Sequence, residues 1–157
     1  MRQEILEALL DAVRQVFRDT DIAIDSVQPG DGLGTDAQVI ASVGLTGDLK
    51  GILVLRTDIP GAARIVTAMM GGLRVPAEPD KLSEVQLAAV AEISNQIAGR
   101  TITLLSERGI HCDITPPAVM CALQMHSLIP DVAESTRQTL LGPFGTLSVF
   151  LGIQHAE

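Results

Sequence analysis

The sequence predicts an α+β fold: a mainly antiparallel β-sheet with long helices packed on one face. The helical patterns and β-rich runs do not alternate regularly, as they would in a parallel α/β protein. Several β-rich runs are separated by short turn-forming stretches that suit antiparallel pairs. The 157 residues are 46% apolar and 19% charged, which suits one compact core. No linker divides residues 1–157, so we expect a single domain.

The first half of the chain predicts two helices and three strands. The expected elements are a helix at 3–17, a short strand at 21–27, a loop at 28–36, strands at 37–45 and 51–57, and a helix starting at 59. Apolar residues at spacings of three and four predict the first helix. Asp58 can cap the second helix, Pro60 suits its first turn, and Gly71–Gly72 end it.

The second half predicts the longest helix and four strands. The expected elements are a link at 75–81, a helix at 83–107, strands at 110–115 and 118–125, and a terminal hairpin of strands at 135–141 and 146–153. Ser83 and Gln86 have the spacing of a capping box, which predicts where the long helix begins. Pro116–Pro117 should stop the strand before them.

The composition excludes several function classes. The formal net charge is −8, and the chain has three Phe, no Tyr and no Trp. Such a chain has neither the positive surface nor the aromatic stacking platforms that nucleic-acid binding needs. The same charge disfavours anionic membranes. With no signal-peptide pattern and no long apolar run, we expect a cytoplasmic protein with no nucleic acid and no membrane as partner.

Two cysteines and two histidines could be written as a metal set. Cys112 and Cys121 are nine residues apart, with His111 and His126 nearby in the sequence. Structural zinc sites usually use close pairs such as CxxC or HxxxH, which are missing here. Cys112 shares a strand face with Ile114, which suits a small buried thiol. We therefore expect core cysteines, no metal and no disulfide.

The predicted helix at 83–107 has two contrasting faces. The core-facing stripe comprises Ala89, Val90, Ile93, Ile97, Thr101 and Leu104. The opposite stripe carries Glu92 and Asn95, whose side chains lie on one surface because they are three residues apart. The small residues around this pair are Ala88, Ala91, Ala98 and Gly99. Such a face can admit another protein closely, although an ordinary solvated surface would show the same spacing.

Gly99 is a poor helix former that lies inside the predicted helix at 83–107. A glycine inside a helix costs about 1 kcal/mol relative to alanine. A close approach by another backbone or by a partner at Gly99 would explain this cost.

The run Glu92–Gly99 (EISNQIAG) resembles the E-x-x-N-x-x-x-G signature of the CheC/CheX/FliY phosphatase family. Other family-like passages are Gly51–Leu55, Met69–Gly71, Ile114–Val119 and Gly145–Val149. The resemblance extends over residues 3–153, and the single signature resembles the CheX branch. Two departures stand out: Ala88 replaces an Asp or Ser of the fuller pattern, and Pro116–Pro117 precede the position of the expected proline, Ala118.

The resemblance implies a phosphatase acting on the aspartyl phosphate of a CheY-like receiver domain. It implies that Asn95 orients the attacking water and that Glu92 docks to the receiver's Lys. Ala88, Ala91 and Gly99 would contact that partner. No cofactor of its own is implied, since Mg²⁺ would come with the receiver, and a homodimer is expected. The alternative is a non-catalytic docking or adaptor module of chemotaxis or flagellar-switch type.

Overall fold

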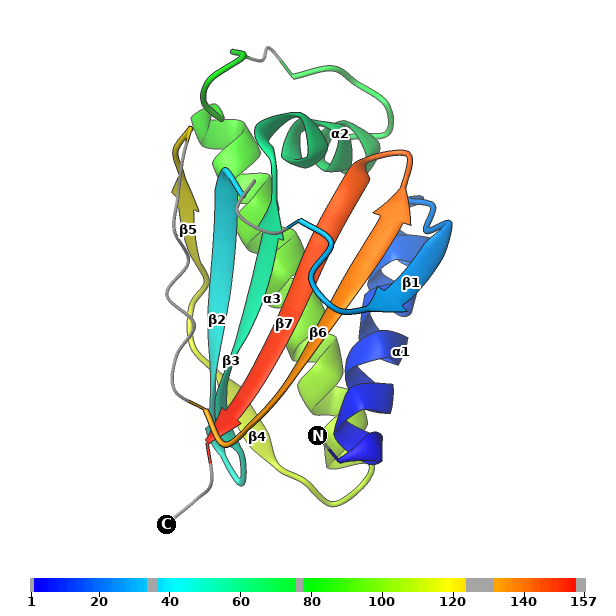
Figure 1. Cartoon of the computed structure of the whole chain (residues 1–157), viewed down its shortest axis with the longest axis vertical. Coiled ribbons are helices and arrows are strands. Elements are labelled where there is room, and N and C mark those ends of the chain that lie inside the picture. Colours follow the sequence, from blue (N-terminus) through cyan, green and yellow to red (C-terminus); the bar gives the residue numbers. More distant parts are fainter. Residues whose placement is uncertain (1, 34–36, 76–77, 124–131, 155–157) are drawn as a thin grey trace.

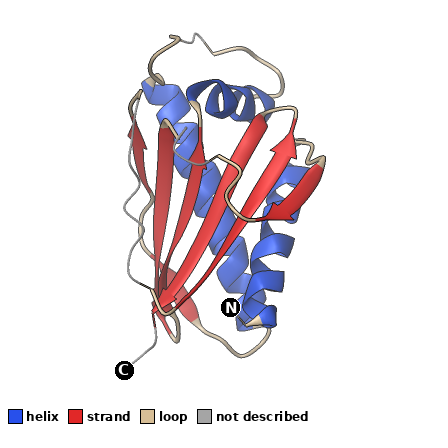
Figure 2. Cartoon of the chain, in the orientation of Figure 1, coloured by secondary structure: helices blue, strands red, loops and turns tan. Residues whose placement is uncertain are grey.

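The computed structural model describes residues 2–33, 37–75, 78–123 and 132–154. In these residues, one seven-stranded sheet is covered on one face by three helices (Figure 1, Figure 2). The elements are α1 (Gln3–Asp19), β1 (Ser26–Pro29), β2 (Val39–Gly47), β3 (Lys50–Thr57), α2 (Ile59–Met69), α3 (Glu84–Ser106), β4 (Cys112–Ile114), β5 (Ala118–Cys121), β6 (Glu134–Gly142) and β7 (Gly145–Gln154). The predicted α+β fold is confirmed. None of the described helices is long and apolar enough to cross a membrane.

The strand order is β1-β6-β7-β3-β2-β4, and β5 also pairs with β2. All described pairings are antiparallel. Along the central strands, alternate residues point toward the helices, as the two-residue period of a strand requires. These buried residues are Val39, Ala41, Val43, Leu45, Leu53, Leu55, Leu147, Val149, Leu151 and Ile153. The main core therefore lies between the sheet and the helical layer.

Arg100 of α3 and Arg108, two residues beyond its end, tie this helix to α1. Arg100 donates to Gln15 (3.0 Å), and Arg108 donates to the backbone carbonyl of Glu4 (2.7 Å). Residues early in α1 thus meet residues late in α3, so the two helices run antiparallel. Arg100 also lies 3.5 Å from Asp19 at the end of α1.

Most predicted elements are confirmed, but the first strand lies later than expected. The structure has β1 at Ser26–Pro29 rather than 21–27. Asp21 has a positive φ of 57°, and the N–H of Ile22 donates to the carbonyl of Phe17 (2.8 Å). This is the left-handed turn that commonly ends a helix. The residues expected to start a strand therefore close α1.

The two strands predicted at 110–115 and 118–125 are present as β4 and β5, but both are shorter than predicted. Both strands pair with β2, and Pro116–Pro117 separate them because proline has no N–H for a ladder. Thr115 bridges the break by accepting the N–H of Gly44 with its hydroxyl (2.9 Å). β5 ends at Cys121, so Ala122 and Leu123 of the expected strand at 118–125 are not part of it. Positions 124–125 of that strand, parts of the loop at 28–36 and of the link at 75–81, and His126 lie outside the described residues.

The segment after β1 covers part of the other sheet face. Leu33, Ala37 and Ile40 form a small second cluster there. Asp31 accepts from Arg56, whose side chain is almost fully buried, at 2.7 Å. This face of the sheet is thus held by the protein's own chain, whereas the outer surface of α3 is not covered in this way.

Candidate functional site

The long helix begins where its sequence predicts. The Ser83 hydroxyl accepts the N–H of Gln86 (3.2 Å), and the Gln86 carboxamide accepts the N–H of Ser83 (2.9 Å). This reciprocal pair satisfies two backbone donors that a helix start leaves open. The 23 residues of α3 then run without a break to Ser106.

The buried face of α3 agrees with the predicted stripe except near the C-terminal end of the helix. Its buried residues are Gln86, Ala89, Val90, Ile93, Ser94, Ile97, Ala98, Thr101 and Leu105. Leu105 is also buried, because steps of four residues lead from Ile97 through Thr101 to Leu105. The predicted Leu104 is half-buried and packs against the same core. Ala98 is 1% exposed and belongs to the core, so it is not part of the outward surface as expected.

Glu92 and Asn95 lie on the outward side of α3. Glu92 is exposed and Asn95 is half-buried. Glu92 accepts a hydrogen bond from Gln96 at 3.0 Å, one turn further along the helix. The side chain of Asn95 makes no hydrogen bond to any described residue, so its donor and acceptor groups are available to an incoming molecule.

Ser94, between these two residues, points the other way. It is 1% exposed, and its hydroxyl donates to the carbonyl of Val90 at 2.8 Å. A buried hydroxyl engaged in this way is a core group rather than a nucleophile. The chemical face of the helix is therefore limited to the outward pair and its small neighbours.

The pair lies near the end of α1 rather than along its middle. Arg100 reaches Gln15 and Asp19 in the last turns of α1. Asn95 is five residues nearer the start of α3, which is about 7.5 Å along the axis. Because α1 ends at Asp19, the surface around Glu92 and Asn95 is not flanked by the body of that helix.

The residues expected to face a partner have small side chains or none, so little protrudes from the helix around Glu92 and Asn95. Ala88 is exposed, and Ala91 and Gly99 are half-buried. A Cβ placed on Gly99 would meet no described atom within 4 Å. No contact between the described elements therefore requires glycine at this position. Close approach by a partner protein is then the explanation to be tested.

The cysteines cannot share a metal or a disulfide within one chain. Cys112 pairs with Gly47 and Cys121 with Val39, at opposite ends of β2. Val39 and Gly47 are eight residues apart along β2, a distance of about 26 Å. Both thiols are free and half-buried. Among the described residues, no group of three His, Cys, Asp or Glu side chains is placed to hold a metal; His126 lies outside them, and the absence of a metal stays a prediction.

The structure also has a pocket beside α2 that the sequence did not predict. Arg64, Arg74 and Gln86 line it, together with Phe144 of the β6–β7 turn. These residues are far apart in the sequence, so no local motif marks them. One signal was present: Arg64 is the only charged residue between Ile59 and Met69.

The family model described as chemotaxis phosphatase CheX matches residues 39–135. This match includes both Glu92 and Asn95 and covers more than half of the chain. The chain belongs to the CheX family. The protein named CheY-P phosphatase CheX from Thermotoga maritima is 31% identical over 127 residues. The match covers 76% of this chain and 77% of the Thermotoga protein.

Solved structures agree with the CheX fold. The CheX-CheY-BeF3-Mg²⁺ complex from Borrelia burgdorferi contains a chain that is 26% identical, with a TM-score of 0.80, covering 98% of this chain and 100% of that one. A CheC-like superfamily protein from Shewanella sp. PV-4 has a TM-score of 0.83 at 18% identity, covering 99% and 100%. The latter likeness concerns the fold alone.

Proposed function

We propose that this protein is a phosphatase that removes the aspartyl phosphate from a CheY-like receiver domain. The observation that carries the proposal is the outward pair Glu92 and Asn95 on α3, within a chain of the CheX family. The relative from Thermotoga maritima is named a CheY-P phosphatase, and the related Borrelia burgdorferi CheX is in complex with CheY.

Asn95 is the group that orients the attacking water. An aspartyl phosphate is a reactive acyl phosphate, so its hydrolysis depends mainly on a water molecule placed in line with the breaking P–O bond. A carboxamide can donate to and accept from one water at once. The Asn95 side chain has no hydrogen-bond partner among the described residues, which leaves it free to insert into the receiver's site.

Glu92 docks the receiver. It is exposed and lies about one turn from Asn95, about 5–6 Å away between Cβ atoms. Its bond from Gln96 uses one carboxylate oxygen and leaves the other for a partner. A lysine of the receiver, beside the phosphate, is the chemically matched group. Such a pair fixes orientation and register more than it adds affinity.

The small residues of the same face allow close approach. Ala88, Ala91 and Gly99 present little side-chain bulk around the pair, so the helix can enter a shallow depression on the receiver. In this proposal Mg²⁺ is supplied by the receiver. Trifluoroberyllate, present with Mg²⁺ in the related complex, has the shape and charge of a phosphoryl group.

The decisive experiment compares receivers from the same genome. Each receiver is charged with acetyl phosphate, and the lifetime of its phosphate is measured with and without this protein. The cognate receiver should lose phosphate faster in a way that saturates with protein concentration. A receiver that binds tightly but keeps its normal phosphate lifetime would contradict the phosphatase and support the docking or adaptor alternative.

We further propose a homodimer. On one side, the described sheet ends in the short strands β4 and β5, and Met120 of β5 is 59% exposed. Natural proteins usually cover or pair such an edge. Light scattering should give twice 16.6 kDa at micromolar concentration. A mass of 16.6 kDa would contradict the dimer without affecting the phosphatase proposal.

A further inference from the structure

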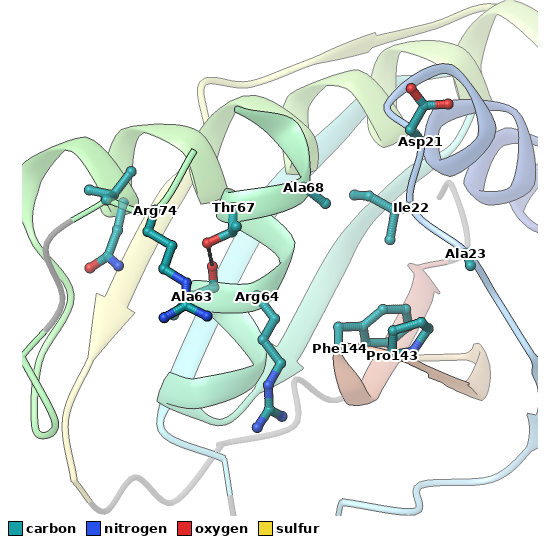
Figure 3. Close-up of a pocket in the computed structure, with 12 residues that line it drawn as sticks. Asp21, Ile22, Ala23, Ala63, Arg64, Thr67, Ala68, Arg74, Pro143 and Phe144 are labelled. Carbon is teal, nitrogen blue, oxygen red and sulfur yellow. Dashed lines mark hydrogen bonds between the residues drawn. The ribbon is translucent and has the colours of Figure 1, made fainter. Parts of the chain in front are cut away.

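A pocket of about 500 Å³ lies between α2, the segment after α1 and the β6–β7 turn (Figure 3). Its apolar lining includes Ile22, Ala63, Ala68 and Phe144. Phe144 is 2% exposed and packs edge-to-face on Phe17, with ring centroids 5.8 Å apart, so this wall is fixed by the core. The volume is within the range of small-molecule sites, about 300–1,000 Å³.

Two arginines from different segments border this pocket. Arg64 comes from α2 and Arg74 from the segment that follows it. Nη1 of Arg64 lies 3.8 Å from the point where a Cβ added to Gly145 would be, so its guanidinium reaches toward the β6–β7 turn. In the described part of the chain, neither arginine is ion-paired with a carboxylate. Unpaired cations beside apolar walls are notable in a chain of charge −8.

Gln86 is an independent sign of a ligand. Gln86 lines the pocket, and only 2% of the residue is exposed. Its Oε1 accepts the N–H of Ser83, which holds the carboxamide in place. Its Nε2 donates to no described residue. Nε2 is not among the described side-chain atoms that are both fully buried and unpaired, so this fixed donor opens to the pocket, where a bound acceptor can reach it.

Asp21 shows where the charged end of a ligand would lie. This carboxylate also lines the pocket, but Figure 3 places it at the end of α1, across the pocket from Arg74. An anionic group would be attracted to the arginines and repelled by Asp21. The apolar body of the same ligand would then rest against Ile22 and Phe144.

We propose that this pocket binds a small organic anion, with a carboxylate or phosphate head at Arg64 and Arg74 and an apolar body over Ile22 and Phe144. The planar guanidinium suits both head groups because it can offer two parallel N–H donors. Gln86 supplies a third donor from the pocket wall. This site is separate from the outward pair on α3, and it does not depend on the phosphatase proposal.

Matched naphthalene compounds test the proposal. The probes are 2-naphthoate, 2-naphthyl phosphate, neutral 2-naphthol and inorganic phosphate, which has no apolar body. Methyl NMR signals of Ile22, Ala63 and Ala68 report on the pocket directly. At least one naphthalene anion should shift these signals saturably, and naphthol and inorganic phosphate should bind at least tenfold more weakly. The stronger of the two anions identifies the head group.

The matched variants are Arg64→Ala/Arg74→Ala and Arg14→Ala/Arg18→Ala. All four arginines are exposed, and both pairs change the net charge equally. The first variant should weaken binding of the anion at least tenfold, whereas the second should stay within about twofold of wild type. Ala68→Leu should fill the pocket and block binding. Equal binding of naphthol and naphthoate, unchanged binding by the first variant, or no saturable shift at millimolar probe would overturn the proposal.

Discussion

The two faces of α3 differ in what holds their residues. The inward residues are enclosed by the sheet and by α1; Ile97, for example, is 0% exposed. On the outward face, the Glu92 side chain makes a hydrogen bond only with its helical neighbour Gln96, and the Asn95 side chain bonds to no described residue. One face therefore serves folding and the other is available to a partner. Substitutions on the two faces should separate stability from activity.

The largest effect is expected on the inward face. Ile97→Ala should lower the free energy of unfolding by about 2–5 kcal/mol, because it leaves a cavity in a fully buried site. Ile97→Val, which removes one methylene, should cost only about 0.5–1.5 kcal/mol. Urea unfolding measures both. Similar values for the two variants would show that the core around α3 closes over the cavity.

Asn95→Ala is expected to have the next largest effect, on turnover rather than folding. Loss of a single group that positions a reacting species commonly lowers the rate about 100-fold or more, or about 2.7 kcal/mol. Binding to the phosphorylated receiver should stay within about twofold, since the interaction acts in the transition state. Stimulated dephosphorylation measures the first effect and titration the second. Full activity would end the assignment of Asn95.

Two controls sharpen this result. Asn95→Asp keeps the shape and the acceptor oxygen of the side chain but replaces its N–H donors by a second, negatively charged oxygen, so it should also lose activity. Thr103→Ala changes another exposed polar residue of α3 and should retain nearly wild-type turnover. The melting temperature should barely move in any of the three, because substitutions on the outward face that break no buried contact rarely exceed about 0.5 kcal/mol.

Glu92→Ala should weaken receiver binding by about 1–2 kcal/mol, a factor of roughly 5–30 in Kd. The reason is the loss of the proposed pair with the receiver's lysine. Added salt should weaken wild-type binding and should affect the variant less, because exposed charges are screened. Combining Glu92→Ala with removal of the receiver's lysine should cost little more than either change alone. Additive losses would place Glu92 outside that contact.

Local signals in the sequence predicted much of the fold. Ser83 and Gln86 predicted the start of α3. The β-rich runs at 51–57 and 146–153 predicted the strands β3 and β7. The first strand was misplaced because the turn after α1 uses a positive φ at Asp21, and no glycine marks it. Aspartate tolerates this conformation, but its presence alone does not predict it.

The candidate site was predictable for a similar reason. Helix spacing places Glu92 and Asn95 on one surface. An ordinary solvated surface has the same spacing, so it was the resemblance of Glu92–Gly99 to the family signature that singled the pair out. The pocket beside α2 could not be found this way, since Ile22, Arg74, Gln86 and Phe144 meet only after the chain folds.

The smallest expected effect tests whether the outward face has a partner. Gly99→Ala should raise the free energy of unfolding by about 0.5–1 kcal/mol, because alanine favours a helix interior and its Cβ meets no described atom within 4 Å. Gly109→Ala is the matched control just beyond α3. Gly109 has a φ of 81°, so the same substitution there should destabilise the protein. Urea unfolding of the two variants measures these opposite signs.

Receiver binding by Gly99→Ala then decides why the glycine is there. If the receiver approaches α3 closely, the added methyl group should weaken binding even though the variant is more stable than wild type. Packing within the chain cannot produce this combination, because a group that disturbs folded contacts would lower stability as well. Wild-type affinity in Gly99→Ala would remove Gly99 from the docking surface and limit that surface to the neighbourhood of Glu92 and Asn95.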